Sequence, residues 1–339
     1  MARVRKKKKR KTFLIVILTL LVLFAAVAGV TMLYINNSLS KINHVEISQD
    51  PADLGIDTNT YSDDKSTTID NILLMGVDSR DPKKYTGLSD AMMILTVDKK
   101  NKKLKLTSIL RDSVVNIEGH GLQKLTHSHN FGGPELTIKT INENYNMNIK
   151  NYVQVNFFTL QKIIDDIGGV TINIKPDEVK WVNGYCHETA RIEKRTPDVL
   201  KGSGPQKLTG MQAVAYARIR YVGTDFERTA RQRRVLSAIF QKLAKTNITD
   251  IPKVANEILP NVETSLSSKY ISSTAIYVLT HGLANKVEQN RVPYDGLYSN
   301  GKINGQDVIQ WNKEENIKKM HDFIFGTDIS STNNGSTTQ

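Results

Sequence analysis

The arginines of this chain of 339 residues are concentrated in one short stretch. YARIRYVGTDFERTARQRR, residues 216–234, holds six of the fourteen arginines and no lysine, although the whole chain favours lysine by more than two to one. Arginine differs from lysine in its planar fork of five N–H donors, which binds paired phosphate or carboxylate oxygens at two points. The composition of this stretch therefore indicates a bound anion rather than a generally basic surface.

The second half of the stretch has the spacing of a helix. If this helix begins three residues before Arg228, then Arg228 and Gln232 lie one turn apart on one face, and Arg231 lies beside them. Arg233 and Arg234 turn to other faces. The first arginines would lie near the helix N-terminus, which itself favours anions.

Arg218 and Arg220 precede the helix and point the same way if the chain between them is extended. Thr224 and Glu227 have the spacing of a capping box at the helix start. The alternative is a solvated basic face held by surface ion pairs, each of which stabilises by about 0 to 1 kcal/mol. Local sequence alone leaves the anion site and the solvated face equally supported.

Two aspartates add a second cluster. In NILLMGVDSRDPKKYTGLSDAMMILTVD, Asp78 ends one apolar run and Asp90 begins the next. Carboxylates at adjacent strand ends suit Mg²⁺, which takes one or two carboxylates and completes its shell with waters and phosphate oxygens. Aspartates in such positions also serve as caps and turn formers, so the spacing alone leaves both interpretations open.

Alternating periodicities predict an α/β sandwich with a largely buried sheet. The segments expected to form strands are 69–78, 91–98, 103–110, 151–155 and 168–174. The segments expected to form helices are 134–146, 157–168, 208–218 and 227–245. Residues 36–68 are polar and turn-rich and are expected to form a stalk with a short strand at its start. Residues 327–339 have the composition of a disordered tail.

The N-terminus has the pattern of a membrane anchor. Residues 1–11 carry eight cations, and residues 12–35 carry no charge. A helix of 24 residues is about 36 Å long, enough to cross a hydrocarbon core of about 30 Å. A cleaved signal peptide is the alternative, but its apolar region would be shorter. The positive-inside rule then keeps residues 1–11 in the cytoplasm and places the rest of the chain outside.

Composition limits the function further. The formal charge of +12 falls to +4 when the eight leading cations are set aside, so the outer part does not have the charge of a nucleic-acid-binding surface. Cys186 is the only cysteine, which excludes an intramolecular disulfide and a thiolate metal cluster. His127 and His129 would share one side of a strand and could bind Zn²⁺, but no further ligand completes the set, so a supporting role beside the site is favoured.

Seven motifs in order resemble the LytR-CpsA-Psr family. They are GVDSR, GLSDAMM, SILRD, KLTHSHNFGG, IGGV, LTGMQAVAYARIRY and DFERTARQRR. The resemblance implies a three-layer α/β/α sandwich with a central mixed sheet, a catalytic core over residues 69–243, and a pocket for a polyprenyl chain. Residues 244–326 are expected to add a helical part to the same domain.

This resemblance implies an extracytoplasmic phosphotransferase of Gram-positive bacteria. Such enzymes move a polymer, such as wall teichoic acid or capsular polysaccharide, from a polyprenyl pyrophosphate carrier to peptidoglycan. The protein would be a single-pass protein of the cell membrane with its catalytic domain outside. Its partners would be the lipid-linked polysaccharide, peptidoglycan and the membrane, but no nucleic acid. Its cofactor would be Mg²⁺ or Mn²⁺, and no ATP is needed because the donor is already activated.

The resemblance also assigns roles to residues. The metal-binding aspartates would be Asp78 and Asp90. The catalytic residues would be Arg111, Asp225 and Arg228. The substrate-binding residues would be Arg80, Arg218, Arg220, Arg231 and Gln232. Asp225 could take the proton of the attacking hydroxyl or orient a neighbouring arginine, and the sequence leaves both roles open.

Two positions depart from the family pattern. Leu88 stands where many members have an arginine, and Leu110 replaces a proline before Arg111. The first change puts one phosphate contact of the family in doubt and is compatible with a different polymer. It is also compatible with a non-catalytic polymer-binding scaffold, although retention of both aspartates argues against a scaffold. A membrane-bound transcriptional regulator is a further alternative, which topology opposes because the arginines lie beyond the membrane helix.

Overall fold

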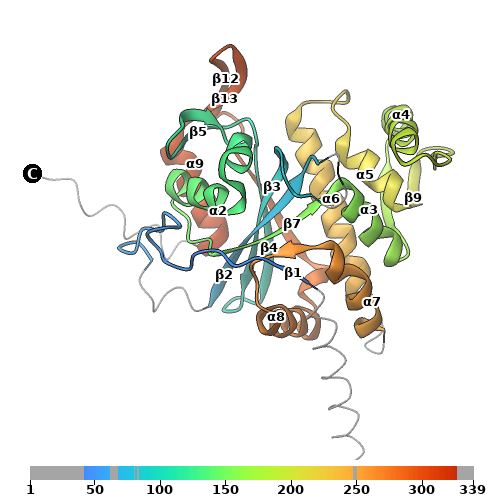
Figure 1. Cartoon of the computed structure of the whole chain (residues 1–339), viewed down its shortest axis with the longest axis horizontal. Helices are drawn as coiled ribbons and strands as arrows, with labels where there is room; N and C mark the ends of the chain where they lie inside the picture. Colours follow the sequence, from blue (N-terminus) through green and yellow to red (C-terminus); the bar gives the residue numbers. More distant parts are fainter. Residues whose placement is uncertain (1–41, 62–67, 80, 82–83, 247–249, 327–339) are drawn as a thin grey trace, which may run out of the picture.

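The computed structural model describes residues 42–61, 68–79, 81, 84–246 and 250–326 (Figure 1). The expected cytoplasmic tail, membrane helix and C-terminal tail lie outside the described residues. Within the described ranges, no helix combines the length and the apolar content needed to cross a membrane.

A seven-stranded mixed sheet forms the centre of the molecule. Its strands, in spatial order, are β1 (Asn43–His44), β10 (Glu263–Thr264), β7 (Asn151–Asn156), β2 (Ile69–Val77), β3 (Ser89–Asp98), β4 (Lys103–Ile109) and β11 (Val287–Val292). β3 is antiparallel to both of its neighbours, whereas β7 is parallel to β2 and β11 is parallel to β4. The carboxyl ends of β2, β4 and β7 therefore meet at one edge, where β3 begins.

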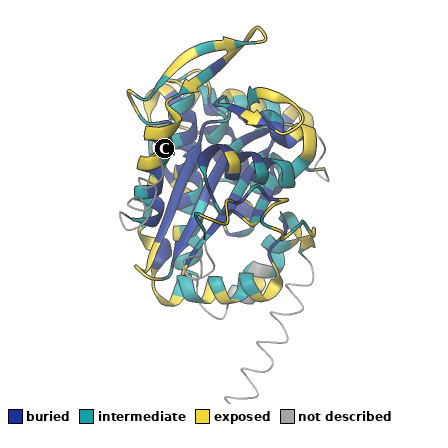
Figure 2. Ribbon diagram, turned by 90° about the vertical axis from the view of Figure 1, so that its left-hand side faces the viewer, coloured by how far each residue is buried: buried dark blue, intermediate teal, exposed yellow. Residues whose placement is uncertain are grey.

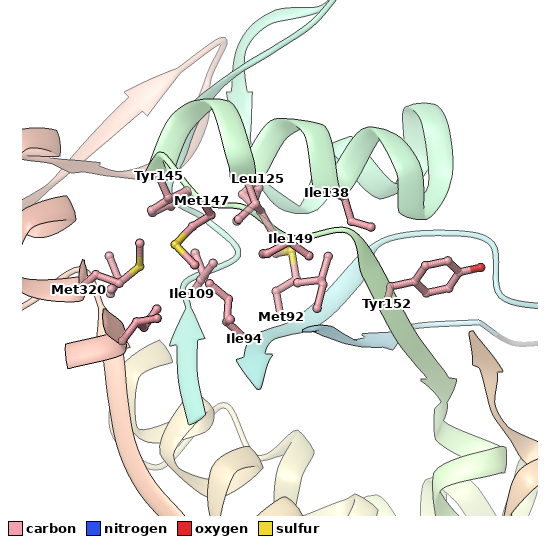
Figure 3. Close-up of a cluster of buried hydrophobic side chains, with 14 of the residues drawn as sticks. Met92, Ile94, Ile109, Leu125, Ile138, Tyr145, Met147, Ile149, Tyr152 and Met320 are labelled. Atoms are coloured by element: carbon pink, nitrogen blue, oxygen red, sulfur yellow. The ribbon is translucent and has the colours of Figure 1, made fainter. Parts of the chain in front are cut away.

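Helices cover both faces of this sheet, which confirms the expected α/β fold with a central mixed sheet. α2 (Thr126–Tyr145) and α9 (Lys313–Phe325) pack on one face. Figure 3 shows the core that they enclose, with Met92, Ile94 and Ile109 from the strands against Ile138, Tyr145 and Met320 from the helices. Because both faces are covered, β2 and β3 read as nearly continuous apolar runs.

The other face carries α3 (Phe157–Asp166), α5 (Gly210–Arg218) and α6 (Asp225–Ala244), with α4 (Pro176–Glu193) packed against α5. β8 (Val170–Ile174) and β9 (Gly204–Leu208) form a separate two-stranded sheet beside them. Figure 2 shows the central strands buried between helices whose outer sides are exposed. The segment expected to form a strand at 168–174 is thus a strand, but it lies outside the central sheet.

Residues 42–61 do not form a free stalk, which corrects the expectation for this part of 36–68. Leu54 is fully buried, Ile56 is nearly so, and both belong to the core beneath α2. Asn142 Nδ2 donates to Leu54 O at 2.8 Å, which fastens the segment to α2. Leu54 and Ile56 stand among turn-forming residues, and two apolar positions are too few to predict this packing from the sequence. The expected short strand at its start is β1.

Residues 244–326 are mixed rather than helical, which is a second correction. Helices α7 (Ile251–Ile258), α8 (Ser268–Thr280) and α9 alternate with the 3₁₀ turns η1 (Leu259–Asn261) and η2 (Leu283–Asn285) and with four strands. β10 and β11 extend the central sheet, and β12 (Tyr298–Ile303) pairs with β13 (Gln306–Trp311). β11 forms by pairing with the edge of β4 that β3 does not occupy. β4 lies more than 170 residues earlier in the chain, so the local sequence does not predict this pairing.

The helix expected at 134–146 begins earlier, after the short hairpin of β5 (Val114–Ile117) and β6 (Gly121–Lys124). α2 starts at Thr126 and is kinked at Gly132 and Gly133. His127 and His129 therefore lie on a helix and not on the strand that the sequence suggested.

Candidate active site

Three of the predicted site residues lie at the edge of the sheet where β3 begins. Asp78 directly follows β2, Asp90 is the second residue of β3, and Arg111 follows β4 by two residues. The Asp78 amide donates to Leu88 O at 3.0 Å and closes the loop between the aspartates. Gly87 has φ of +119°, and a Cβ there would lie 3.1 Å from Asp78 O, so this closed loop favours glycine.

The N-terminus of α6 reaches the same edge. Thr224 caps the helix, since its side chain accepts a hydrogen bond from the Phe226 amide at 3.3 Å. The Glu227 carboxylate accepts from the Thr224 amide at 2.6 Å, which completes the predicted capping box. The helix thus begins at Asp225, as its spacing indicates, and presents Arg228 on its first turn.

Acidic and basic groups alternate at this edge. Arg111 Nη1 and Arg220 Nη2 donate to the two carboxylate oxygens of Asp90, the second at 3.1 Å. Arg228 Nη2 donates to Asp225 Oδ2 at 2.5 Å, and Arg111 Nε lies 3.8 Å from the same oxygen. The network joins β3, the end of β4, the loop before α6 and α6 itself.

A cavity of about 150 Å³ lies beside this network. Six of the predicted residues line it, namely Asp78, Asp90, Arg218, Arg220, Arg228 and Gln232. The rings of Phe157 and Tyr185 form part of its wall. The structure therefore brings carboxylates, guanidinium groups and aromatic rings to one polar cavity.

Arg218 is held between two rings. Its guanidinium carbon lies 4.9 Å from the ring centroids of both Phe157 and Tyr185. Arg218 Nη2 also donates to Glu188 Oε1 at 3.0 Å. Such contacts attract a cation to the ring faces and restrict its rotamers. Arg218 thus has a defined position at the cavity wall.

Arg228 is buried, with 2% of its surface exposed, but it is only partly paired. Its Nε and Nη1 groups, and Oε1 of Gln232, have no hydrogen-bond partner in the part of the chain that the structure describes. Burial and the neighbouring Arg111 lower the pKa of Arg228. A buried donor without a partner costs about 1–3 kcal/mol. Arg228 is therefore a buried cation at the cavity that its partners in the described part of the chain satisfy only in part.

The carboxylates near these arginines differ in their pKa. Burial raises the pKa of Asp225, although Arg228 and Arg111 oppose the shift. Burial acts in the same direction on Asp112, but Arg111 and Lys124 outweigh it and lower the pKa of Asp112. A raised pKa brings a carboxylate closer to that of an effective general base, so Asp225 is the better proton acceptor of the two.

Arg231 does not line the cavity, which corrects its predicted contact with substrate. It is also 2% exposed, and its Nε donates to the buried Glu178 at 2.8 Å. Its Nη1 and Nη2 donate to the backbone oxygens of Ile219 and Val222, at 3.2 and 2.6 Å. Arg231 therefore holds the loop that carries Arg220. Arg80, also predicted to bind substrate, lies outside the described residues.

Both the sequence and the fold match those of known proteins. A model of the LytR_cpsA_psr family matches residues 29–322. The chain belongs to the LytR-CpsA-Psr family. One relative, the polyisoprenyl-teichoic acid–peptidoglycan teichoic acid transferase TagT of Bacillus subtilis (strain 168), is 31% identical over 253 residues, which cover 72% of this chain and 75% of the relative.

Two solved LytR-CpsA-Psr structures share the fold. One is described as TagT bound to LIIa-WTA, with 27% identity and a TM-score of 0.63 over 83% of this chain and 99% of that one. The other is described as the LytR-CPS2A-psr family protein YwtF (TagT) with bound octaprenyl pyrophosphate lipid, with 26% identity and a TM-score of 0.60 over the same shares.

Sequence reasoning missed three residues of this LytR-CpsA-Psr cavity region. Phe157 follows β7, and its place could have been inferred from the parallel pairing of β7 with β2. Tyr185 and Glu188 lie on α4, a helix that was not predicted, and no local motif marks them. Within the described ranges, no group of three or more histidines, cysteines or acids could hold a metal, which leaves the zinc interpretation of His127 and His129 without support.

Proposed function

We propose that this protein transfers a phosphate-linked glycopolymer from a polyprenyl diphosphate to a hydroxyl group of peptidoglycan. The observation that carries the proposal is the buried Arg228, which has two unpaired groups in the described part of the chain and lines a cavity together with Arg218 and Arg220. A diphosphate concentrates negative charge on oxygens that these donors can bind in pairs. The name of the TagT relative and the octaprenyl pyrophosphate bound to a solved relative support the same substrate class.

The transfer breaks the phosphoanhydride bond of the diphosphate and forms a phosphate ester bond to the acceptor. The acceptor hydroxyl oxygen attacks the phosphorus that carries the polymer, and the bond from this phosphorus to the bridging oxygen breaks. Polyprenyl phosphate leaves with the bridging oxygen, and the polymer becomes linked to the acceptor through a phosphodiester. Asp225 accepts the hydroxyl proton, consistent with its raised pKa. Phosphoryl transfer depends on positioning and charge stabilisation, which the arginines supply.

The proposal includes Mg²⁺ or Mn²⁺ as cofactor. Asp78 and Asp90 line the same cavity, and Mg²⁺ typically takes one or two carboxylates from a protein. These residues therefore fit a divalent ion whose shell is completed by phosphate oxygens and water. When bound, such an ion would neutralise charge on the diphosphate. Arg111 and Arg220 hold the two oxygens of Asp90 and fix its orientation.

The proposal also places the catalytic domain outside the cell, anchored by residues 12–35. Its basis is the charge pattern of the N-terminus. Protease added to intact protoplasts should digest the domain while the short basic end stays protected. A domain that survives until the cells are lysed would show that the topology is inverted, and would reopen the regulator alternative.

The decisive assay for the function is transfer with purified components. The full-length protein in detergent is incubated with a short saccharide linked to a polyprenyl diphosphate, together with peptidoglycan fragments. Mass spectrometry should detect a phosphodiester-linked product and an equal amount of polyprenyl phosphate. A protein that binds the lipid but forms no product, with either metal ion, would instead be a polymer-binding scaffold.

A further inference from the structure

The first turn of α2 lies against the loop that carries the active-site residues. Thr126 Oγ1 donates to Ser89 O at 2.8 Å, and the Thr126 amide donates to Arg111 O at 2.9 Å. Ser89 directly precedes Asp90. One buried residue thus ties the backbone beside Asp90 to the backbone of Arg111. The proposed transfer assigns no role to this turn.

His129, three residues further along α2, reaches the same loop. It is 3% exposed, and its Nδ1 lies 2.8 Å from Gly87 O. Gly87 in turn packs against the backbone oxygen of Asp78, where a Cβ would lie at 3.1 Å. His129 therefore contacts the loop between the two aspartates at a residue that packs against the Asp78 backbone.

The second ring nitrogen of His129 also lies within hydrogen-bonding distance of a side chain. Its Nε2 lies 2.9 Å from Gln154 Oε1, and Gln154 Nε2 donates to the carboxylate of Glu263. Tyr152 OH donates to the same Glu263 oxygen at 3.0 Å. Because the Gln154 amide nitrogen faces a carboxylate, its oxygen must face the histidine. Both ring nitrogens thus lie within hydrogen-bonding distance of an oxygen acceptor.

This bonding connects the loop to two strands of the seven-stranded sheet. Gln154 lies on β7 and Glu263 on β10, two neighbouring strands whose positions are fixed by backbone pairing. The loop between the aspartates is thereby fastened to rigid strands rather than to another loop.

The glycine kink of α2 makes this placement possible. Gly133 has φ of +64°, and a Cβ on Gly132 would lie 2.6 Å from the side chain of Leu136. After the kink, Ile138 and Ile141 pack into the core under the sheet. The kink thus separates the turn that carries His129 from the part of α2 that packs in the core.

We propose that His129 is a positioning residue for the transfer reaction, which sets the separation of Asp78 and Asp90 by holding Gly87. The inference rests on the proposed function for its chemistry, but its geometry stands independently. Removing the ring's donors should loosen the loop and misplace the carboxylates. Residues that orient metal ligands typically change metal affinity or activity by about 10–100-fold when they are mutated.

The test compares His129→Phe with His127→Phe. His127 lies on the same turn, and its Nδ1 faces only Gln123 Oε1 at 3.3 Å, so it serves as a matched control. His129→Phe should increase hydrogen exchange of the loop at residues 84–90, whereas His127→Phe should not. His129→Asn should be intermediate, because its amide can donate to Gly87 O but not also to Gln154.

A second readout measures metal binding directly. Electron paramagnetic resonance follows Mn²⁺ binding in the presence of farnesyl diphosphate. His129→Phe should weaken Mn²⁺ binding by about tenfold or more and lower kcat by a similar factor. KM for the lipid should change less, because the arginines remain. Equal exchange rates and equal Mn²⁺ affinity in the two phenylalanine variants would overturn the proposal.

Two outcomes separate this inference from the proposed function. If the wild-type protein binds no Mn²⁺, the metal part of the proposed function fails, and the exchange experiment still decides the role of His129. If His129→Phe does not fold, Thr126→Val provides an independent variant, since it removes only the hydrogen bond to Ser89 O. Wild-type exchange in the loop of both Thr126→Val and His129→Asn would then contradict the proposal.

Discussion

Arg228 and Arg231 lie three residues apart on α6, and each is 2% exposed, yet their surroundings are opposite. Arg231 pairs with the buried Glu178 and with two backbone oxygens. Arg228 has one carboxylate partner and two nitrogens without any in the described part of the chain. The difference distinguishes an arginine whose donors are satisfied by the fold from one whose remaining donors we propose to bind the ligand, although both are equally buried.

The largest effect should come from removing each arginine in turn. Arg231→Met leaves the Glu178 carboxylate buried without its partner, which should lower the free energy of unfolding by about 3–5 kcal/mol. Arg228→Met removes a poorly paired cation and should change it by about 1 kcal/mol or less. Urea unfolding of both variants measures these changes in the free energy of unfolding. Equal destabilisation would show that the two arginines have the same structural role.

Asp225 and Glu178, the acidic partners of Arg228 and Arg231, should differ in the same way when they are mutated. Asp225→Asn should lower kcat by about a hundredfold, because it removes a general base, and should lose less stability than Glu178→Gln, because the Asp225 side chain is 30% exposed and that of Glu178 is 1% exposed. Glu178→Gln should instead weaken the fold, because it neutralises the buried partner of Arg231. Transfer rates and unfolding curves for the two variants give the comparison. An Asp225→Asn protein with wild-type kcat would leave Asp225 no role in proton transfer.

The pH dependence tests the same carboxylate. Burial raises the pKa of Asp225 above the 3.8 of an ordinary aspartate, so the acid limb of kcat/KM should lie above that value. A carboxyl group whose pKa is raised by folding stabilises the fold most below its unfolded pKa, and this contribution is lost as the pH rises through the folded pKa. Asp225→Asn should remove both effects. An unchanged acid limb in this variant would assign the limb to another group.

The smallest effect is expected at the exposed end of the stretch. Arg234 is exposed and donates to Tyr216 OH at 3.0 Å. Arg234→Ala should change stability by about 0.5 kcal/mol or less and leave turnover unaltered. Arg233 cannot serve as a second control, because it is 8% exposed and two of its buried nitrogens have no partner among the described residues. A large loss of transfer in Arg234→Ala would mean that the site extends beyond the cavity.

Local patterns were sufficient for the elements that carry the site. β2, β3 and β4 follow apolar runs, and the capping box marks the start of α6, so Asp78, Asp90 and Arg228 could be placed near one sheet edge. These signals depend on neighbours in sequence. The order of strands and the parallel pairing of β11 with β4 depend on distant segments, which no local pattern records.

The roles of Arg228 and Arg231 could not be separated from sequence. Both follow the capping box on the first two turns of α6, and both had been expected to face the anion. Their difference arises from Glu178, which lies 53 residues before Arg231 on a helix that was not predicted. The same limit applies to His129, whose partners on β7 and in the aspartate loop become neighbours only in the folded chain.

The central claim is that Arg228 binds phosphate oxygens through its paired donors. Lysine keeps the charge but loses the fork, so Arg228→Lys should slow transfer by about tenfold or more, equivalent to about 1.4 kcal/mol of transition-state stabilisation. Arg234→Lys is the matched control and should transfer at the wild-type rate. The measurement is single-turnover transfer from a short lipid-linked saccharide to peptidoglycan fragments, beside the wild-type protein. If Arg228→Lys and Arg234→Lys transfer at the same rate, the unpaired donors of Arg228 do not bind the diphosphate and the proposed site is wrong.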